Sequence, residues 1–140
     1  MDLRQGKRFW GALATAFMLM GLGAGLVLAH TSEYATLIED YTTTEQTGPD
    51  PGGFKADIGS TKAACVPDRR VRVIRDNDSK VVKSDDTNDA GKARILFPQG
   101  LALGTYYLSV KRSVIERAAH KHICAKEETP PTMFQFDPAE

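Results

Sequence analysis

The chain has 140 residues, and 18 lysines and arginines balance 18 aspartates and glutamates, so its formal net charge is zero at neutral pH. A chain of this length has room for one folded domain, and its balanced charge excludes the bulk attraction to nucleic acid that a basic protein would show. We therefore expect no nucleic-acid partner.

Residues 1–29 predict a signal peptide or an N-terminal membrane anchor. Three cations within the first eight residues precede an uncharged run, FWGALATAFMLMGLGAGLVLA, at positions 9–29. The run is long enough to span a bilayer, but its last residues, Val27-Leu28-Ala29, also suit signal peptidase, so cleavage after Ala29 and a retained anchor both stay open. In either case the positive flank stays in the cytoplasm. We expect everything from His30 onward to be extracytoplasmic, either secreted or tethered to the membrane through residues 9–29 alone.

Residues 30–53 predict a flexible linker. The stretch is polar and rich in threonine, and it ends in Gly48-Pro49-Asp50-Pro51-Gly52-Gly53. Glycine and proline at this density break regular structure, and the polar composition offers little apolar surface to bury. We expect a disordered spacer, with at most a helical turn or two around Leu37 and Ile38.

Residues 54–128 show the pattern of an all-β domain. Short runs alternate apolar and polar residues, as where Val71 and Val73 alternate with Arg70 and Arg72, and turn residues separate the runs. The expected strands lie at 54–58, 69–75, 80–84, 92–97, 105–112 and 120–126, with a seventh at 133–136 inside a C-terminal tail of residues 129–140. Residues 113–121 favour at most one helical turn in a connecting loop. The prediction is a small antiparallel β-sandwich of six or seven strands, preceded by an N-terminal hydrophobic helix and a disordered spacer.

The two cysteines, Cys65 and Cys124, both lie in the part expected to be exported. In an oxidising compartment such a pair most often forms a disulfide, and a domain this small usually needs a covalent link. The bridge would close a loop of about 60 residues and stabilise the fold by about 4 kcal/mol in the chain-entropy model. We therefore predict one disulfide and no cofactor.

The stretch HKHICAK, at 120–126, suggests an alternative to the disulfide, namely a metal site. His120, His122 and Cys124 occupy alternate positions of the expected strand and so point to the same side. Together with His30 they could supply ligands to zinc or copper, which would make the chain a small metal-binding protein or a metal-dependent enzyme. Ligands two residues apart on one strand point in parallel rather than toward a common centre, and a disulfide leaves no thiolate. The disulfide is therefore preferred, and the metal site stays an alternative.

The run TNDAGKARILFPQGLALGTYYLSV, at 87–110, has a further pattern: a Thr/Asp-rich turn with glycine, a strand, a leucine, a Gly-Thr-Tyr turn and an alternating strand. Its members are Thr87, Asn88, Gly91, Leu101 or Leu103, Gly104, Thr105, Tyr106, Leu108 and Val110. We expect Gly91 and Gly104 to take the positive φ of tight turns. The pattern resembles the carboxypeptidase regulatory-like and transthyretin-like β-sandwich modules of exported bacterial proteins. The resemblance extends from residue 54 to about residue 126 and implies a non-catalytic spacer, surface or accessory module.

One surface is a candidate for binding. Its members are outward-facing residues of the expected strands, namely Arg70, Arg72, Arg94, Tyr107 and Lys111. If the strands are neighbours, this basic and partly aromatic face suits an acidic cell-wall polymer or a surface protein, although outward charges also guard ordinary sheets against association. The sequence contains no Gly-x-Ser-x-Gly nucleophile elbow and no phosphate-binding glycine loop. We therefore expect a non-catalytic binding or structural module, or a subunit that docks onto a membrane complex, rather than an enzyme.

Overall fold

The computed structural model describes residues 30–44 and 50–139, and this part of the chain is all-β. The predicted signal peptide or anchor at 1–29 lies outside the described residues. Among the residues that are described, no helix has the length and hydrophobicity needed to cross a membrane. The elements are β1 (His30–Tyr34), β2 (Leu37–Thr44), β3 (Gly53–Gly59), the 3-10 turn η1 (Ala63–Cys65), β4 (Arg70–Arg75), β5 (Lys80–Asp86), β6 (Lys92–Leu96), β7 (Leu101–Val110), β8 (Ser113–Arg117), β9 (His120–Cys124), β10 (Glu127–Glu128) and β11 (Thr132–Phe136).

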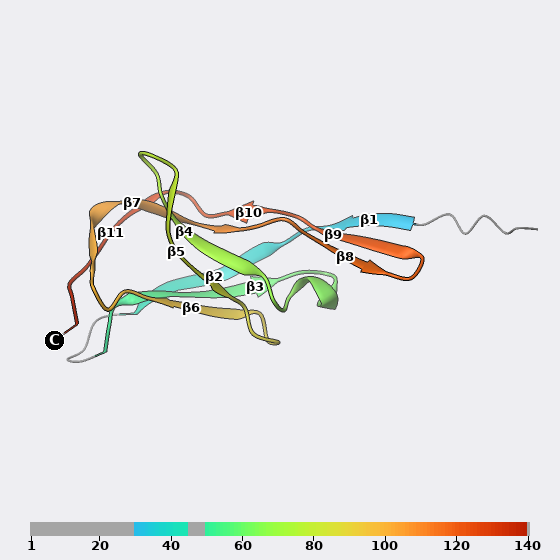
Figure 1. The fold of residues 1–140 in the computed structure, drawn as a ribbon, viewed down its shortest axis with the longest axis horizontal. Helices are drawn as coiled ribbons and strands as arrows, with labels where there is room; N and C mark the ends of the chain where they lie inside the picture. The colour runs from blue at the N-terminus through green and yellow to red at the C-terminus, as the bar shows by residue number, and fades with distance from the viewer. Residues whose placement is uncertain (1–29, 45–49, 140) are drawn as a thin grey trace, which may run out of the picture.

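The strands form three sheets (Figure 1). One is antiparallel, with β3 between β2 and β6. In the second, β4 and β7 are central, β5 lies at one edge, and β10 and β11 pair with different parts of β7 at the other. Figure 1 shows these two sheets as two layers, with the third sheet, β1-β9-β8, extending beyond them at one end. We call this third sheet the arm; in it β1 runs parallel to β9, and β8 runs antiparallel to β9.

The core lies between the two layers and follows the predicted alternation along the strands. Its buried cluster consists of Phe54, Ala56, Ile58, Val71, Val73, Ala93, Ile95, Phe97, Leu101, Tyr106, Leu108 and Val110. The ring centroid of Phe54 lies 4.8 to 6.1 Å from those of Phe97, Phe134 and Phe136, all edge-on to it. Edge-on packing of this kind adds to the stabilisation that burial of the rings provides. The result is an all-β, β-sandwich-like fold, as predicted.

The structure differs from the linker predicted at 30–53. Residues 30–34 form β1 and residues 37–44 form β2, which pairs along its length with β3. Ile38 and Tyr41 of β2 pack against the core. The outer face of the β2-β3-β6 sheet is exposed to solvent, so the outward positions of β2 can be polar, and its β-branched threonines suit an extended backbone. Residues 45–49 of the predicted linker lie outside the described part.

Two further segments are strands where a loop or a tail is predicted. Residues 113–117 form β8 rather than a helical turn, because they pair with β9 across a tight turn in which Ala118 has a φ of 47°. Residues 132–136 form β11, which confirms the seventh predicted strand and joins the predicted tail to the domain through β7. The described part therefore holds more strands than the six or seven predicted.

The two glycines predicted at positive φ behave differently. Gly91 has a φ of 78°, and a methyl group there would collide with the carbonyl oxygen of Ile58. Gly104 lies inside β7, and the turn before that strand uses Gly100, with a φ of 76°. The prediction for Gly104 is wrong because β7 begins at residue 101, earlier than the strand expected at 105.

Candidate binding surface

The predicted disulfide between Cys65 and Cys124 is present, with the two Cα atoms 5.4 Å apart and both residues fully buried. It joins η1 to the end of β9 and therefore fastens the arm to the sandwich. Its sulfur atoms are bonded to each other, so Cys124 has no thiolate to offer a metal. Within residues 30–44 and 50–139, no three His, Cys, Asp or Glu side chains are placed to hold a metal ion.

The three histidines of the chain lie on one face of the arm. His30 is in register with His120 across the β1-β9 pair, and the rings of His120 and His122 stack with their centroids 6.4 Å apart. His30 and Glu33 have the His-x-x-Glu spacing of zinc carboxypeptidase ligands. Residues three apart on a strand, however, point to opposite sides, so these two do not converge.

A buried arginine, Arg69, connects the arm to the sandwich through its hydrogen bonds. It is 2% exposed, and its guanidinium donates four hydrogen bonds of 2.9 Å: to the hydroxyl of Thr36 and to the carbonyls of Cys65, Lys111 and Ala125. These acceptors belong to the β1-β2 turn, to η1, and to the segments that follow β7 and β9. Burial lowers the pKa of Arg69, but arginine stays protonated at neutral pH.

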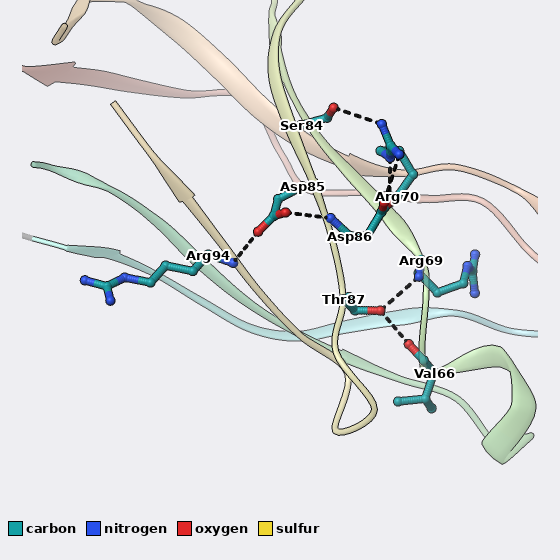
Figure 2. A network of polar contacts seen from close by, with 8 residues as sticks. All are labelled: Val66, Arg69, Arg70, Ser84, Asp85, Asp86, Thr87 and Arg94. Atoms are coloured by element: carbon teal, nitrogen blue, oxygen red, sulfur yellow. Dashed lines mark hydrogen bonds and ion pairs between the residues drawn. The ribbon is translucent and has the colours of Figure 1, made fainter. Parts of the chain in front are cut away.

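The sequence contains a signal for this burial in the alternation of the strand that follows Arg69. Arg69 shares the odd-numbered parity of Val71 and Val73, which point into the core, whereas Arg70 has the even parity of the outward residues. Alternation therefore predicts an inward Arg69, and only its charge argues against burial. Its backbone amide is also held, by the hydroxyl of Thr87 at 2.9 Å (Figure 2).

The structure divides the surface predicted to bind ligand between two sheets. Arg70 and Arg72 lie on the outer face of β4, next to Tyr107 in β7 and to Lys111, whose backbone amide bonds to the carbonyl of Arg70. Arg94 belongs to β6 in the other layer, and Figure 2 shows its side chain pointing away from Arg70. The β4-β7 face therefore unites four of the five predicted residues.

Acidic or polar neighbours engage both arginines of the β4-β7 face. The Nε and one Nη of the Arg70 guanidinium donate to the two carboxylate oxygens of Asp86, the Nη bond at 2.8 Å, and this hydrogen bonding raises the pKa of Arg70 (Figure 2). Arg72 bonds the hydroxyl of Ser109 at 3.2 Å. The pKa of Glu128, which lies beside Ser109 in β10, is lowered chiefly by its hydrogen bond with Lys126 and also by the charge of Arg72. A carboxylate therefore engages Arg70, whereas Arg72 and Lys111 form no ion pair within the described part of the chain.

A polar hollow of about 390 Å³ lies on the outer face of the β2-β3-β6 sheet. It is lined by Asp40, Thr42, Lys55, Asp57, Asn88, Lys92, Ala93 and Arg94. Strand register arranges most of these residues in two rows: Asp40, Asp57 and Lys92 in one, and Thr42, Lys55 and Arg94 in the other. They take the outward positions of strands whose inward positions form the core, so alternation places them together.

The two rows differ in electrostatics. In the first row Lys92 bonds Asp57 at 2.8 Å, and this hydrogen bond raises the pKa of Lys92. In the second row Lys55 and Arg94 are direct cross-strand neighbours, and neither forms an ion pair within the described part of the chain. Like charges placed opposite each other on adjacent strands are destabilising. The second row is therefore a place where a negatively charged group would be favourable.

Comparisons with protein-family models, with curated proteins and with solved structures found no match to this chain.

Proposed function

We propose that this protein is an exported, non-catalytic binding module, and that the outer face of its β2-β3-β6 sheet binds an acidic cell-wall glycan. The observation that carries the proposal is the row in which Lys55 and Arg94 lie side by side and neither side chain forms an ion pair with a described residue, although the backbone amide of Arg94 donates to Asp85 at 3.4 Å (Figure 2). Carboxylates already engage Lys92 on the same face and Arg70 on the β4-β7 face, whereas Arg72 and Lys111 of the β4-β7 face form no ion pair with a described residue, which is why that face serves as the control below.

The side chains of the hollow match the groups of an acidic sugar. The guanidinium of Arg94 can bind a carboxylate through two parallel hydrogen bonds, and Lys55 adds a second positive charge. Thr42 and Asn88 offer a hydroxyl and an amide to the sugar hydroxyls, and Asp40 offers acceptors to them. A polymer repeats its carboxylates, so even a weak single contact gains effective affinity through neighbouring units.

Export and the resemblance to non-catalytic β-sandwich modules fit this role. A disulfide between the two cysteines is typical of an oxidising compartment outside the cytoplasm. Removing residues 1–29 takes away three cations and one acid, so residues 30–140 keep 15 of the 18 cations and 17 of the 18 acids. With a slight excess of acids, binding to an anionic polymer needs a local cluster such as the Lys55 and Arg94 row.

The test is binding of the purified protein to polygalacturonate, with a neutral glucan as the comparison ligand, by affinity electrophoresis and calorimetry. We expect binding to polygalacturonate alone, weakening with added salt. Lys55→Glu combined with Arg94→Glu should lower affinity by about tenfold or more, because charge-assisted hydrogen bonds are lost and repulsion replaces them.

The matched control is Arg70→Glu combined with Lys111→Glu, which changes net charge equally on the β4-β7 face. We expect this variant to bind almost as well as the parent protein. If it loses binding while the Lys55 and Arg94 variant keeps it, the β4-β7 face is the binding surface and our assignment is wrong. Equal binding to the neutral glucan would refute an acidic ligand.

A further inference from the structure

A second hollow lies where the arm meets the sandwich. It has a volume of about 390 Å³ and is lined by Lys62, Ala63, Ala64, Arg117 and His122. Lys62 is the residue before η1, the alanines belong to η1, and Arg117 and His122 come from β8 and β9. The disulfide at Cys65 fixes η1 against β9, so the hollow has a covalently fastened wall.

Every ionisable side chain that lines this hollow is basic. The ammonium group of Lys62 lies 5.7 Å from the ring centroid of Tyr34, and that ring lies 5.5 Å from the ring of His122. His120 stacks on the far side of His122. Neither Lys62 nor Arg117 forms an ion pair with any described residue.

The acidic residues of the arm lie on its opposite face. Glu33 and Glu116 alternate with the residues of the histidine face along β1 and β8, and Glu116 pairs with Lys121 at 3.5 Å. The positive charges around His122 are therefore not neutralised by a carboxylate across the strand. This segregation of charge distinguishes the hollow from an ordinary mixed surface.

The environment of His122 shows the same excess of positive charge. The imidazole is half-buried, and its Nδ1 atom is buried without a hydrogen-bond partner among the described residues. Burial is the largest cause that lowers the pKa of His122, and the positive charges of Lys62, His120 and Arg117 lower this pKa further. Within residues 30–44 and 50–139, no carboxylate is among the groups that shift this pKa.

We propose that this hollow binds a phosphate or sulfate group. Arginine, lysine and imidazole N–H groups are suitable donors to the oxygens of a tetrahedral anion, and the small side chains of Ala63 and Ala64 leave room for it. The proposal goes beyond the glycan-binding face, since it concerns other residues, another part of the fold and another anion. A bound anion would favour the protonated imidazole, so binding should strengthen as the pH falls toward the pKa of His122.

The test follows the imidazole signals of His122 by NMR in the full-length protein during titration with inorganic phosphate, and separately with sulfate. We expect saturable shifts and, at saturation, a rise in the pKa of His122. Lys62→Gln and Arg117→Gln should each weaken binding by about tenfold, which corresponds to loss of one charge-assisted hydrogen bond.

The matched control is Lys121→Gln, on the opposite face of the same strand as His122. It removes the same charge, so equal weakening by this variant would mean that net charge rather than the hollow attracts the anion. Absence of saturable shifts at His122 with both anions would also overturn the proposal. Loss of glycan binding in the Lys55 and Arg94 variant, with phosphate binding intact, would show that the two surfaces act separately.

Two sources of phosphate can be separated in the same assay. Glycerophosphoglycerol is the water-soluble headgroup of phosphatidylglycerol, and it carries a phosphodiester with one negative charge. If it binds as tightly as inorganic phosphate and is weakened by the same two variants, the hollow accepts a lipid headgroup or another phosphodiester. If only inorganic phosphate binds, the hollow accepts a free phosphate or a monoester. Either result supports the site.

Discussion

Replacing Arg69 with methionine should destabilise the protein more than any other single substitution of an arginine in β4 or next to it. The variant keeps most of the apolar stem but loses all four hydrogen bonds of the guanidinium. A hydrogen bond from a charged donor contributes a net stabilisation of about 1.5–3 kcal/mol, and the bonds of one guanidinium do not add independently, so the loss is smaller than four times this value. Removing one partner of a buried charged network typically costs about 3–5 kcal/mol, because the groups left behind stay buried without a partner. The expected net loss of unfolding free energy is therefore about 3–5 kcal/mol.

The measurement is guanidinium-induced unfolding of the oxidised protein, monitored by circular dichroism. The control is Arg70→Met at the neighbouring position, where an exposed ion pair with Asp86 is lost, and a much smaller change in stability is expected because solvent screens exposed pairs. Arg69→Lys keeps the charge but lacks the planar guanidinium that reaches all four acceptors. Its loss of unfolding free energy should therefore lie between the losses of Arg69→Met and Arg70→Met. A loss below about 1 kcal/mol for Arg69→Met would refute the reasoning, as would equal losses at both positions.

Two further predictions concern the arm. Replacing Cys65 and Cys124 together by alanine removes the disulfide, which closes a loop with a sequence separation of 59. In thermal unfolding, this variant should lose about 4 kcal/mol of unfolding free energy, and its Tm should fall by roughly 15 °C. A loss below about 1 kcal/mol would contradict the chain-entropy model. The pKa of His122 is lowered in the folded protein by burial and by neighbouring cations, so the unfolded chain binds more protons between that pKa and about 6.5. Tm in phosphate-free buffer should therefore fall as the pH drops through this window, and His122→Gln should make the fall smaller; an identical fall in both proteins would exclude His122 as its cause.

The parts of the fold that follow from local pattern could be predicted from the sequence. Alternation with a period of two placed Val71, Val73 and Ile95 in the core, because a strand with one buried face must alternate in this way. The disulfide followed from the number of cysteines and the expected compartment. Gly91 followed from its position in a turn, since only glycine takes that backbone conformation at little cost.

The parts that depend on distant partners could not be predicted in the same way. β2 is polar, and it is a strand because β3 lies beside it and two of its side chains, Ile38 and Tyr41, reach the core. Arg69 is buried because four separate segments bring oxygen atoms to its guanidinium. Neither condition is visible in a window of neighbouring residues, and composition argues against both.

The candidate site shows where alternation stops being informative. It correctly places Arg70, Arg72 and Arg94 at outward positions, but it does not say which strands are neighbours. Strand register then decides how much of the charge is available. In the β4-β5 pair, Arg70 faces Asp86, and the two groups neutralise each other. In the β3-β6 pair, Arg94 faces Lys55, and the two charges add. Surfaces with the same number of arginines and lysines can therefore attract an anion to very different degrees. The variants at Lys55 and Arg94 test this difference directly, because the control pair removes equal charge from a face where the register already supplies an acid.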